Sequence, residues 1–294
     1  MSRRMQEVRG WLMASPYLLF AIIFFFLPLL WSVVLVFSDW NLIAPDWRWV
    51  GLQNFLEALQ SRRVQQAFLS SFRFMIFVVP LGLAVSLAIA LLVNSLKRFQ
   101  GLFAVGFFLP YLASGVAVSL VVRGALAFNS PVGRFFLNNF GYVPDWLGNP
   151  WLAILIISLM IVWKFSGYYA LIFLAGLQSI PKELYEAAQI DGASSWRTFW
   201  SITLPMLYPA LYSVLILMVG LMFGIFTEPY VLTKGGPDLA THTWHLEIYY
   251  QAFSALRSGY ATAISTLNAL AVFITVMIVR RIMERWGRNL GWVD

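Results

Sequence analysis

The sequence contains no cysteine and few charged residues. Without cysteine, a disulfide framework and a thiolate metal site are both excluded. Charged residues make up 11% of the 294 residues, where a soluble domain has about 25%, and hydrophobic residues make up 60%. This composition indicates a membrane protein.

Several motifs of enzymes and nucleic-acid-binding proteins are also missing. The chain has no HExxH, GxSxG or GxxxxGK[ST] motif and no paired carboxylates within an apolar segment, so we expect neither an enzyme nor an ATPase site. The formal net charge of +7 could suggest nucleic acid. The basic residues instead cluster beside apolar segments, which indicates membrane orientation.

Six apolar segments have the roughly twenty residues needed to cross a bilayer. They cover residues 12–37, 72–94, 102–122, 151–177, 207–230 and 262–283. The first follows Arg3 and Arg4 like a signal peptide, but it is too long for one and no small-residue cleavage site precedes Ser38-Asp39-Trp40. We therefore expect a retained helix. Pro16, Pro28, Pro80 and Pro110 interrupt the first three segments. Broken helices of this kind accompany transport pathways, but proline is also common in membrane helices in general, and the sequence leaves both interpretations open.

The basic residues set the expected orientation. Those beside the presumed inner ends are Arg3, Arg4, Arg9, Lys97, Arg98, Lys182, Arg197, Arg280, Arg281, Arg285 and Arg288. They lie tightly against the segment ends, as the positive-inside rule requires. We therefore expect a multi-pass protein of the cytoplasmic (inner) membrane with both termini cytoplasmic. The connection between the fourth and fifth segments is then cytoplasmic too.

That connection is more ordered than a turn needs to be. It contains Glu186-Ala187-Ala188, then Gly192, then Ile202-Thr203-Leu204-Pro205. Pro181 suits the first turn of a helix, Glu183 suits its positive end, and Gly192 supplies a left-handed stop. The pattern predicts a helix about 16 Å long, followed by a second short helix over 196–202 that is capped by Ser194 or Ser195.

One face of the predicted helix combines small and apolar residues. Leu184, Ala187, Ala188 and Asp191 follow the i, i+3, i+4, i+7 spacing of a single helix face. Such a short amphipathic helix can seat in a groove on a partner protein. A helix resting on lipid headgroups is the alternative. Such helices usually carry Lys and Arg, whereas the charged residues of this one are two glutamates, an aspartate and a single lysine, which anionic lipid would repel. Docking is the favoured interpretation.

The loop resembles the EAA loop of permease subunits in binding-protein-dependent ABC importers, and residues 175–205 are similar to the sugar-transporting, MalF/UgpA-like branch. The similarity extends nearly end to end, through Pro16-Tyr17-Leu18, Ser38-Asp39-Trp40, Gly51-Leu52-Gln53-Asn54-Phe55 and Leu232-Thr233-Lys234-Gly235-Gly236-Pro237. It implies an all-α polytopic membrane protein with six transmembrane helices and the type I ABC importer permease (MetI-like) fold. A single permease domain would cover 1–294, with its core over 72–283.

The resemblance also implies partners and a division of labour. Residues 181–205 would form the coupling helix and its flanks, seated in a cytosolic ATPase through Glu186, Ala187, Ala188, Asp191, Gly192, Leu204 and Pro205. The implied partners are a second permease subunit in a heterodimer, a homodimeric ABC ATPase that binds ATP and magnesium, an extracytoplasmic solute-binding protein and membrane lipid. The chain itself is expected to bind no cofactor, metal or nucleic acid.

Two intramembrane charges are candidate functional residues. Lys164 lies in the middle of the fourth segment and Glu228 at the outer end of the fifth. A charge in lipid costs several kcal/mol unless it is paired or faces water. Direct solute contact, pairing of the two residues and snorkelling of Lys164 are all open readings.

In the resembling family, the solute pocket lies between the helices before and after the EAA loop. By position this implicates Lys164, Phe165, Tyr168, Met218, Leu221, Met222, Ile225 and Glu228. Aromatic rings can stack on sugar faces, which supports Phe165 and Tyr168. The fifth-segment positions are all apolar, whereas a sugar pocket needs hydrogen-bonding groups. We therefore expect much of the solute recognition on the partner permease and the binding protein. The expected solute is a sugar, a polyol or a glycerol phosphate. An ion-coupled secondary transporter is the alternative, but Glu228 alone approaches the buried acids that it needs.

Overall fold

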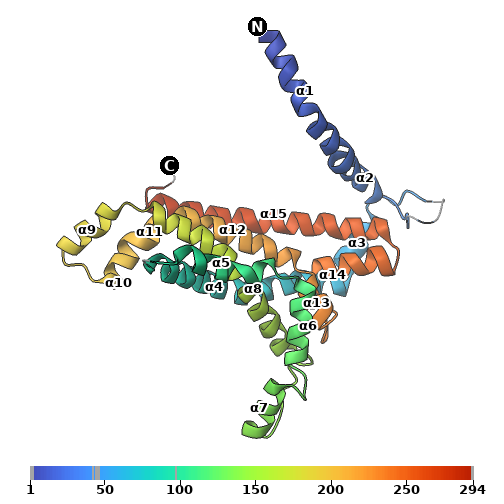
Figure 1. Cartoon of the computed structure of the whole chain (residues 1–294). Helices are drawn as coiled ribbons and strands as arrows, with labels where there is room; N and C mark the ends of the chain where they lie inside the picture. Colours follow the sequence, from blue (N-terminus) through green and yellow to red (C-terminus); the bar gives the residue numbers. More distant parts are fainter. Residues whose placement is uncertain (1–2, 42, 44–46, 97, 293–294) are drawn as a thin grey trace. The chain divides into compact units, whose positions relative to one another are not determined.

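The computed structural model describes residues 3–41, 43, 47–96 and 98–292. Within these ranges every regular element is a helix, apart from an isolated bridge between Ser38 and Trp49 (Figure 1). The chain divides into two compact units: Met1–Val64 with Glu247–Leu267, and Gln65–Leu246 with Asn268–Asp294. Lys97, one of the residues used to orient the chain, lies outside the described residues.

Five helices in the described ranges are long and apolar enough to cross a membrane. They are Arg9–Leu35, Arg62–Ser95, Pro150–Ser179, Tyr208–Leu232 and Ser258–Asn289. A sixth span results if helices α5 (Gln100–Leu112) and α6 (Gly115–Ala125) are taken together. All six segments predicted from the sequence lie on these helices, so the all-α polytopic fold is confirmed.

The third predicted segment, 102–122, is not one straight helix. Helices α5 and α6 meet at 86°, because Ala113 and Ser114 have extended backbones with ψ of 140° and 125°. Pro110, in the last turn of α5, lacks the N–H that would continue the hydrogen-bond ladder. The proline predicted to interrupt this segment therefore lies just before a sharp break.

The first unit contains the N-terminal helices and the short elements that follow them or precede the C-terminal helix. Its elements are α1 (Arg3–Ala21), the π-helix η1 (Ile22–Phe26), α2 (Leu27–Leu35), α3 (Gln53–Gln60) and the π-helix η3 (Tyr250–Ser254). Helices α4 (Arg62–Ser95), α14 (Trp244–Tyr249) and α15 (Ser258–Asn289) each have residues in both units. The most apolar part of the first span, Arg9–Leu35, is only 6% buried, so its surface is left for lipid or another subunit.

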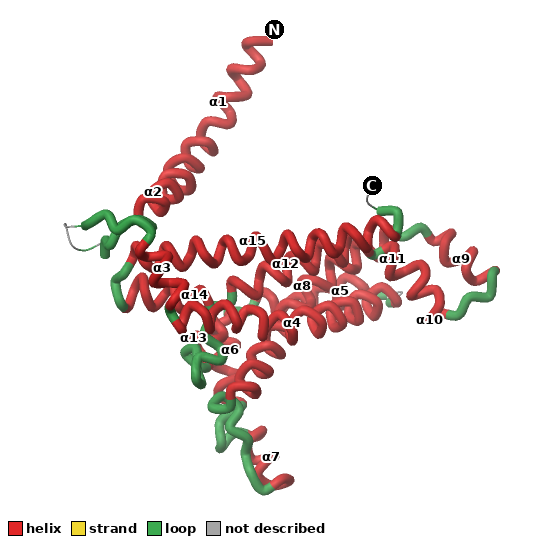
Figure 2. The backbone as a smooth tube through the Cα atoms, turned by 180° about the vertical axis from the view of Figure 1, so that it is seen from behind, coloured by secondary structure: helices red, strands yellow, loops and turns green. Residues whose placement is uncertain are grey.

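The second unit is a helical bundle around α8 (Pro150–Ser179). Its remaining elements are α5, α6, α7 (Pro131–Phe140), α9 (Lys182–Ile190), α10 (Ser195–Thr198), the π-helix η2 (Phe199–Thr203), α11 (Leu204–Met206), α12 (Tyr208–Gly224) and α13 (Thr227–Leu232). Figures 1 and 2 show α4, α5, α8 and α12 side by side. Phe74, Phe173 and Met222 from α4, α8 and α12 are fully buried in their shared core.

Helix α8 is apolar on nearly every side, as is typical of a helix at the centre of a bundle. Ile154, Ile157 and Ile161 point into the core. Trp151 and Trp163 instead belong to an exposed stripe at four-residue spacing. One face of α8 is therefore available to lipid or a partner helix.

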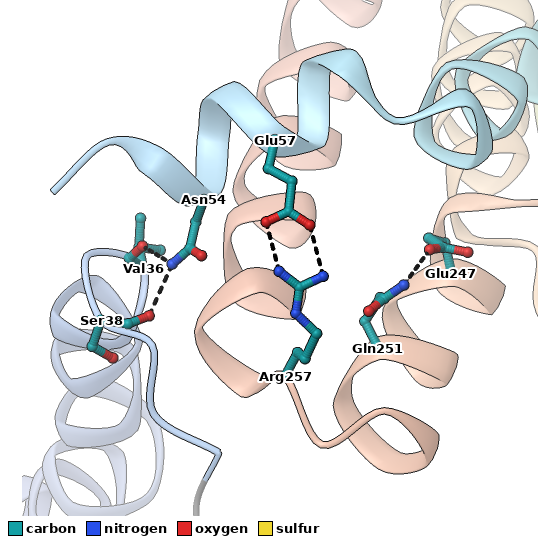
Figure 3. Close-up of polar contacts among 7 residues, drawn as sticks. All are labelled: Val36, Ser38, Asn54, Glu57, Glu247, Gln251 and Arg257. Carbon is teal, nitrogen blue, oxygen red and sulfur yellow. Dashed lines mark hydrogen bonds and ion pairs between the residues drawn. The ribbon is translucent and has the colours of Figure 1, made fainter. Parts of the chain in front are cut away.

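In the first unit, polar contacts hold α3 in place (Figure 3). Nδ2 of Asn54 donates hydrogen bonds to the carbonyl oxygens of Val36 (2.8 Å) and Ser38 (2.9 Å), just after α2. Nearly one turn later, the Glu57 carboxylate accepts two hydrogen bonds from the Arg257 guanidinium, at 2.7 and 2.6 Å. Helix α3 is thereby tied to the end of the first span and to the residue before α15.

The hydrogen bonds from Arg257 lower the pKa of the Glu57 carboxyl from its ordinary value, although partial burial opposes the shift. A carboxyl with a depressed folded-state pKa stabilises the fold above its unfolded pKa. That stabilisation is lost as the pH falls through the folded value. Both side chains are almost half exposed, so the pair contributes at most about 1 kcal/mol.

Replacing Asn54 by aspartate is expected to lower the melting temperature of the detergent-solubilised protein. Two buried carbonyl oxygens would lose their donor and face a carboxylate, at a cost of about 1–3 kcal/mol each. Asn139→Asp is the matched control, because Asn139 makes its hydrogen bond on an exposed surface of α7. Equal melting of Asn54→Asp and the control would contradict this role for Asn54.

Candidate functional site

The connection between α8 and α12 contains the predicted short helix. Helix α9 runs over Lys182–Ile190 with Glu183 in its first turn, and Gly192 follows with φ of +71°, as predicted. Pro181 is the residue before the helix rather than part of its first turn. A side chain at Gly192 would meet open space. The positive φ, and not crowding, therefore explains why glycine occupies this position.

The second part of the connection is longer than predicted. Ser194, one of the two predicted caps, accepts a hydrogen bond from the Arg197 N–H at 3.3 Å and begins α10. The chain then continues through η2 and α11, so the predicted helix over 196–202 is divided between two elements. Pro205 lies in α11, and its carbonyl oxygen accepts a hydrogen bond from Nε1 of Trp292 at 3.0 Å.

The predicted docking face of α9 is only partly free. Ala188 is 8% exposed and packs within this chain, so it cannot belong to a fully accessible docking face. The Tyr185 hydroxyl lies 3.2 Å from the Thr203 hydroxyl and joins α9 to η2. Glu186, Ala187 and Asp191 are exposed. Figure 2 shows α9 and α10 projecting beyond one end of the bundle.

The two intramembrane charges form an ion pair. Lys164 Nζ on α8 lies 3.7 Å from Glu228 Oε1 on α13, and the side chains are only 13% and 9% exposed. Of the alternatives open for Lys164, pairing with Glu228 is thus the one found. Lys164 Nζ also lies 5.6 Å from the centre of the Phe165 ring, within the range of a cation–π interaction.

Aromatic side chains extend from the ion pair along α8. Tyr168 stacks on Tyr111 of α5 with ring centres 4.8 Å apart, and Tyr111 also packs edge-on against Phe165 at 5.6 Å. Phe165 and Tyr168 are candidates from the sequence, whereas nothing in the sequence pattern singles out Tyr111. Tyr111 follows Pro110 in a segment without charge, and only the fold brings it to α8.

The candidate residues on the fifth span have a different environment. Met218, Met222 and Ile225 are at most 3% exposed and belong to the hydrophobic core, and Leu221 packs against that core. In this conformation these four residues stabilise the bundle. The polar and aromatic candidates that the structure brings together are Lys164, Phe165, Tyr168 and Glu228.

The comparisons with known proteins agree with this architecture. Residues 8–288 match the family of inner membrane components of binding-protein-dependent transport systems. The chain belongs to this family. It is accordingly a multi-pass membrane protein and the permease subunit of an ABC importer, as predicted.

Among its relatives, the sn-glycerol-3-phosphate transport system permease protein UgpA of Yersinia pestis is 34% identical, with 94% of each chain covered. The trehalose/maltose permease protein MalF of Thermococcus litoralis is 32% identical, covering 93% of this chain and 92% of the relative. A bacterial ABC transporter that imports the acidic polysaccharide alginate has a chain with a TM-score of 0.82 and 23% identity, over 97% of this chain and 99% of that one. This match shows the shared permease fold.

The contact between α5 and α8 gives a direct test of the aromatic cluster. A Cβ on Gly167 would overlap the carbonyl oxygen of Phe107, so Gly167→Ala is expected to push α5 away from α8. Such overpacking costs about 1–3 kcal/mol and should lower the melting temperature. Gly220→Ala is the control, because its Cβ would meet nothing within 4 Å. A Gly167→Ala protein as stable as the control would contradict this packing.

Proposed function

We propose that this chain forms half of the translocation pathway of an ATP-driven importer for a sugar, a polyol or a glycerol phosphate. The observation that carries the proposal is the family match over residues 8–288, joined to the projecting helix α9. Relatives named for lactose, trehalose/maltose and sn-glycerol-3-phosphate support this range of solutes. The stacked rings of Tyr111 and Tyr168 offer apolar faces suited to sugar rings.

Helix α9 would dock on the ATPase. Its exposed Glu186 and Asp191 can pair with basic groups, and Ile190, which is 87% exposed, can enter an apolar hollow. Leu204 and Pro205, half-buried in α11, would carry the movement from the loop into α12. At its other end the loop continues directly from α8, so displacement of α9 would move both helices as rigid bodies.

The full transporter would contain four kinds of subunit. A second, different permease would complete the pathway, a homodimeric ABC ATPase would bind ATP and magnesium, and an extracytoplasmic binding protein would deliver the solute. A bacterial alginate ABC transporter has been solved in complex with a periplasmic protein that carries alginate pentasaccharide. In this arrangement both termini and α9 face the cytoplasm, and this chain carries no ATPase site.

An ion-coupled secondary transporter is the weaker alternative. It would need an acidic group free to exchange a proton or a sodium ion. Glu228, the candidate for that role, is engaged with Lys164 at 3.7 Å. The contact therefore favours the importer.

Gly192→Val is expected to abolish ATP-dependent uptake while leaving the protein inserted in the membrane. A β-branched residue with φ of +71° is strained by about 1–3 kcal/mol, enough to reshape the turn after α9. Uptake and coupled ATP hydrolysis would be measured in proteoliposomes that contain the complete transporter.

Gly192→Asn is the matched variant, since asparagine tolerates the left-handed conformation. It should keep most of the uptake and coupled hydrolysis. Normal uptake by a correctly assembled Gly192→Val transporter would contradict the proposed coupling role.

A further inference from the structure

The Lys164–Glu228 pair lies where three helices meet. Lys164 is on α8, Glu228 is in the first turn of α13, and Gly115 is the first residue of α6. A Cβ on Gly115 would lie 3.0 Å from Lys164 Nζ and 3.4 Å from Glu228 Oε1. The pair is therefore enclosed by the break between α5 and α6.

The Glu228 carboxylate lies beside the first residue of α6, close to the Lys164 ammonium. Removal of one partner would leave the other charge buried and uncompensated, which is far more costly than loss of an exposed pair. Lys164 and Glu228 therefore form a neutral unit within the membrane.

The same unit is continuous with the aromatic cluster. The Phe165 ring lies within cation–π range of the Lys164 ammonium and packs edge-on against Tyr111, and Tyr111 stacks on Tyr168. Without Glu228, an ammonium beside these rings would attract phosphate or carboxylate groups. With Glu228 in place, a solute at the rings meets apolar faces and a compensated charge.

A further cation in a predicted span has a partner of its own. Arg73, on α4 and at the start of the second predicted span, donates a hydrogen bond from Nη2 to Gln66 Oε1 at 3.2 Å. Its guanidinium is thus engaged on α4. Lys164 is the cation in contact with the aromatic cluster. Because Glu228 neutralises it, Glu228 sets the net charge that a solute meets at the rings.

We infer that Glu228 is a specificity-determining residue, which neutralises Lys164 so that the pathway accepts uncharged saccharides or polyols and disfavours solutes with phosphate or carboxylate groups. This inference rests on the proposed importer function and narrows its solute class. The relatives do not decide between uncharged and anionic solutes, because they include permeases named for trehalose/maltose and for sn-glycerol-3-phosphate.

The test uses the complete transporter in proteoliposomes. Its binding protein is first screened by thermal shift against lactose, maltotriose, glycerol, glycerol 3-phosphate and an oligouronate, and ATP-dependent uptake of every solute that binds is then measured. Uptake of uncharged solutes is the expected result. ATP-dependent uptake confined to anionic solutes would overturn the inference and leave the importer function intact, whereas absence of ATP-dependent uptake would overturn both.

Variants then test the residue itself. Glu228→Gln leaves the ammonium unpaired and is expected to reduce uptake of the uncharged solute at least about tenfold, since breaking a buried pair is strongly unfavourable. The double variant Lys164→Met with Glu228→Gln removes both charges and should recover uptake to within about threefold of the wild type. Glu57→Gln, which breaks an exposed ion pair outside the spans, is the matched control.

Two results separate specificity from folding. Each variant is first shown to assemble with its partners by size-exclusion chromatography. In an assembled Glu228→Gln transporter, the ratio of anionic to uncharged uptake should rise. An unchanged ratio, or a double variant as impaired as the single one, would contradict the inference.

Discussion

A charge within a lipid bilayer has no water to solvate it, so it must find its partner inside the protein. The ion pair between Lys164 and Glu228 meets this requirement and brings α8 and α13 together. Gly115 leaves room for α6 to begin directly beside the pair. The start of α6, the first turn of α13 and the aromatic cluster all lie beside this contact.

Helix α8 connects the two ends of the proposed mechanism. It carries Lys164, Phe165 and Tyr168 in its middle and leads into α9 just beyond Ser179. Tyr168 and Ser179 are eleven positions apart, which corresponds to about 16 Å of helix. The helix is continuous over this distance, and the two non-helical residues Ile180 and Pro181 connect it to α9.

The sequence predicts those features that depend on composition and local conformation. Long apolar runs locate the spans, and Gly192 marks the end of α9 because few other residues adopt a positive φ. Hydropathy contains no directional information, so it cannot reveal that α5 and α6 meet at 86°. For the same reason the stacking of Tyr111 on Tyr168 is visible only in the fold.

Helical periodicity has a related limit, since it groups residues on a face but does not say what covers that face. Ala188 belongs to the predicted docking face, yet it is buried within this chain. Met218 and Met222, which the family resemblance places in the solute pathway, lie in the core between α4, α8 and α12, and their contact with solute stays a prediction. Tertiary packing, which the sequence pattern does not contain, decides what surrounds each of these residues.

The most direct test of the account is to tag this chain in its native membrane, extract it gently and identify the proteins that co-purify. The account predicts an ABC ATPase and a second permease, in a complex whose ATP hydrolysis responds to a solute-loaded binding protein. Recovery of the chain alone or as a homodimer, without a nucleotide-binding partner, would contradict it.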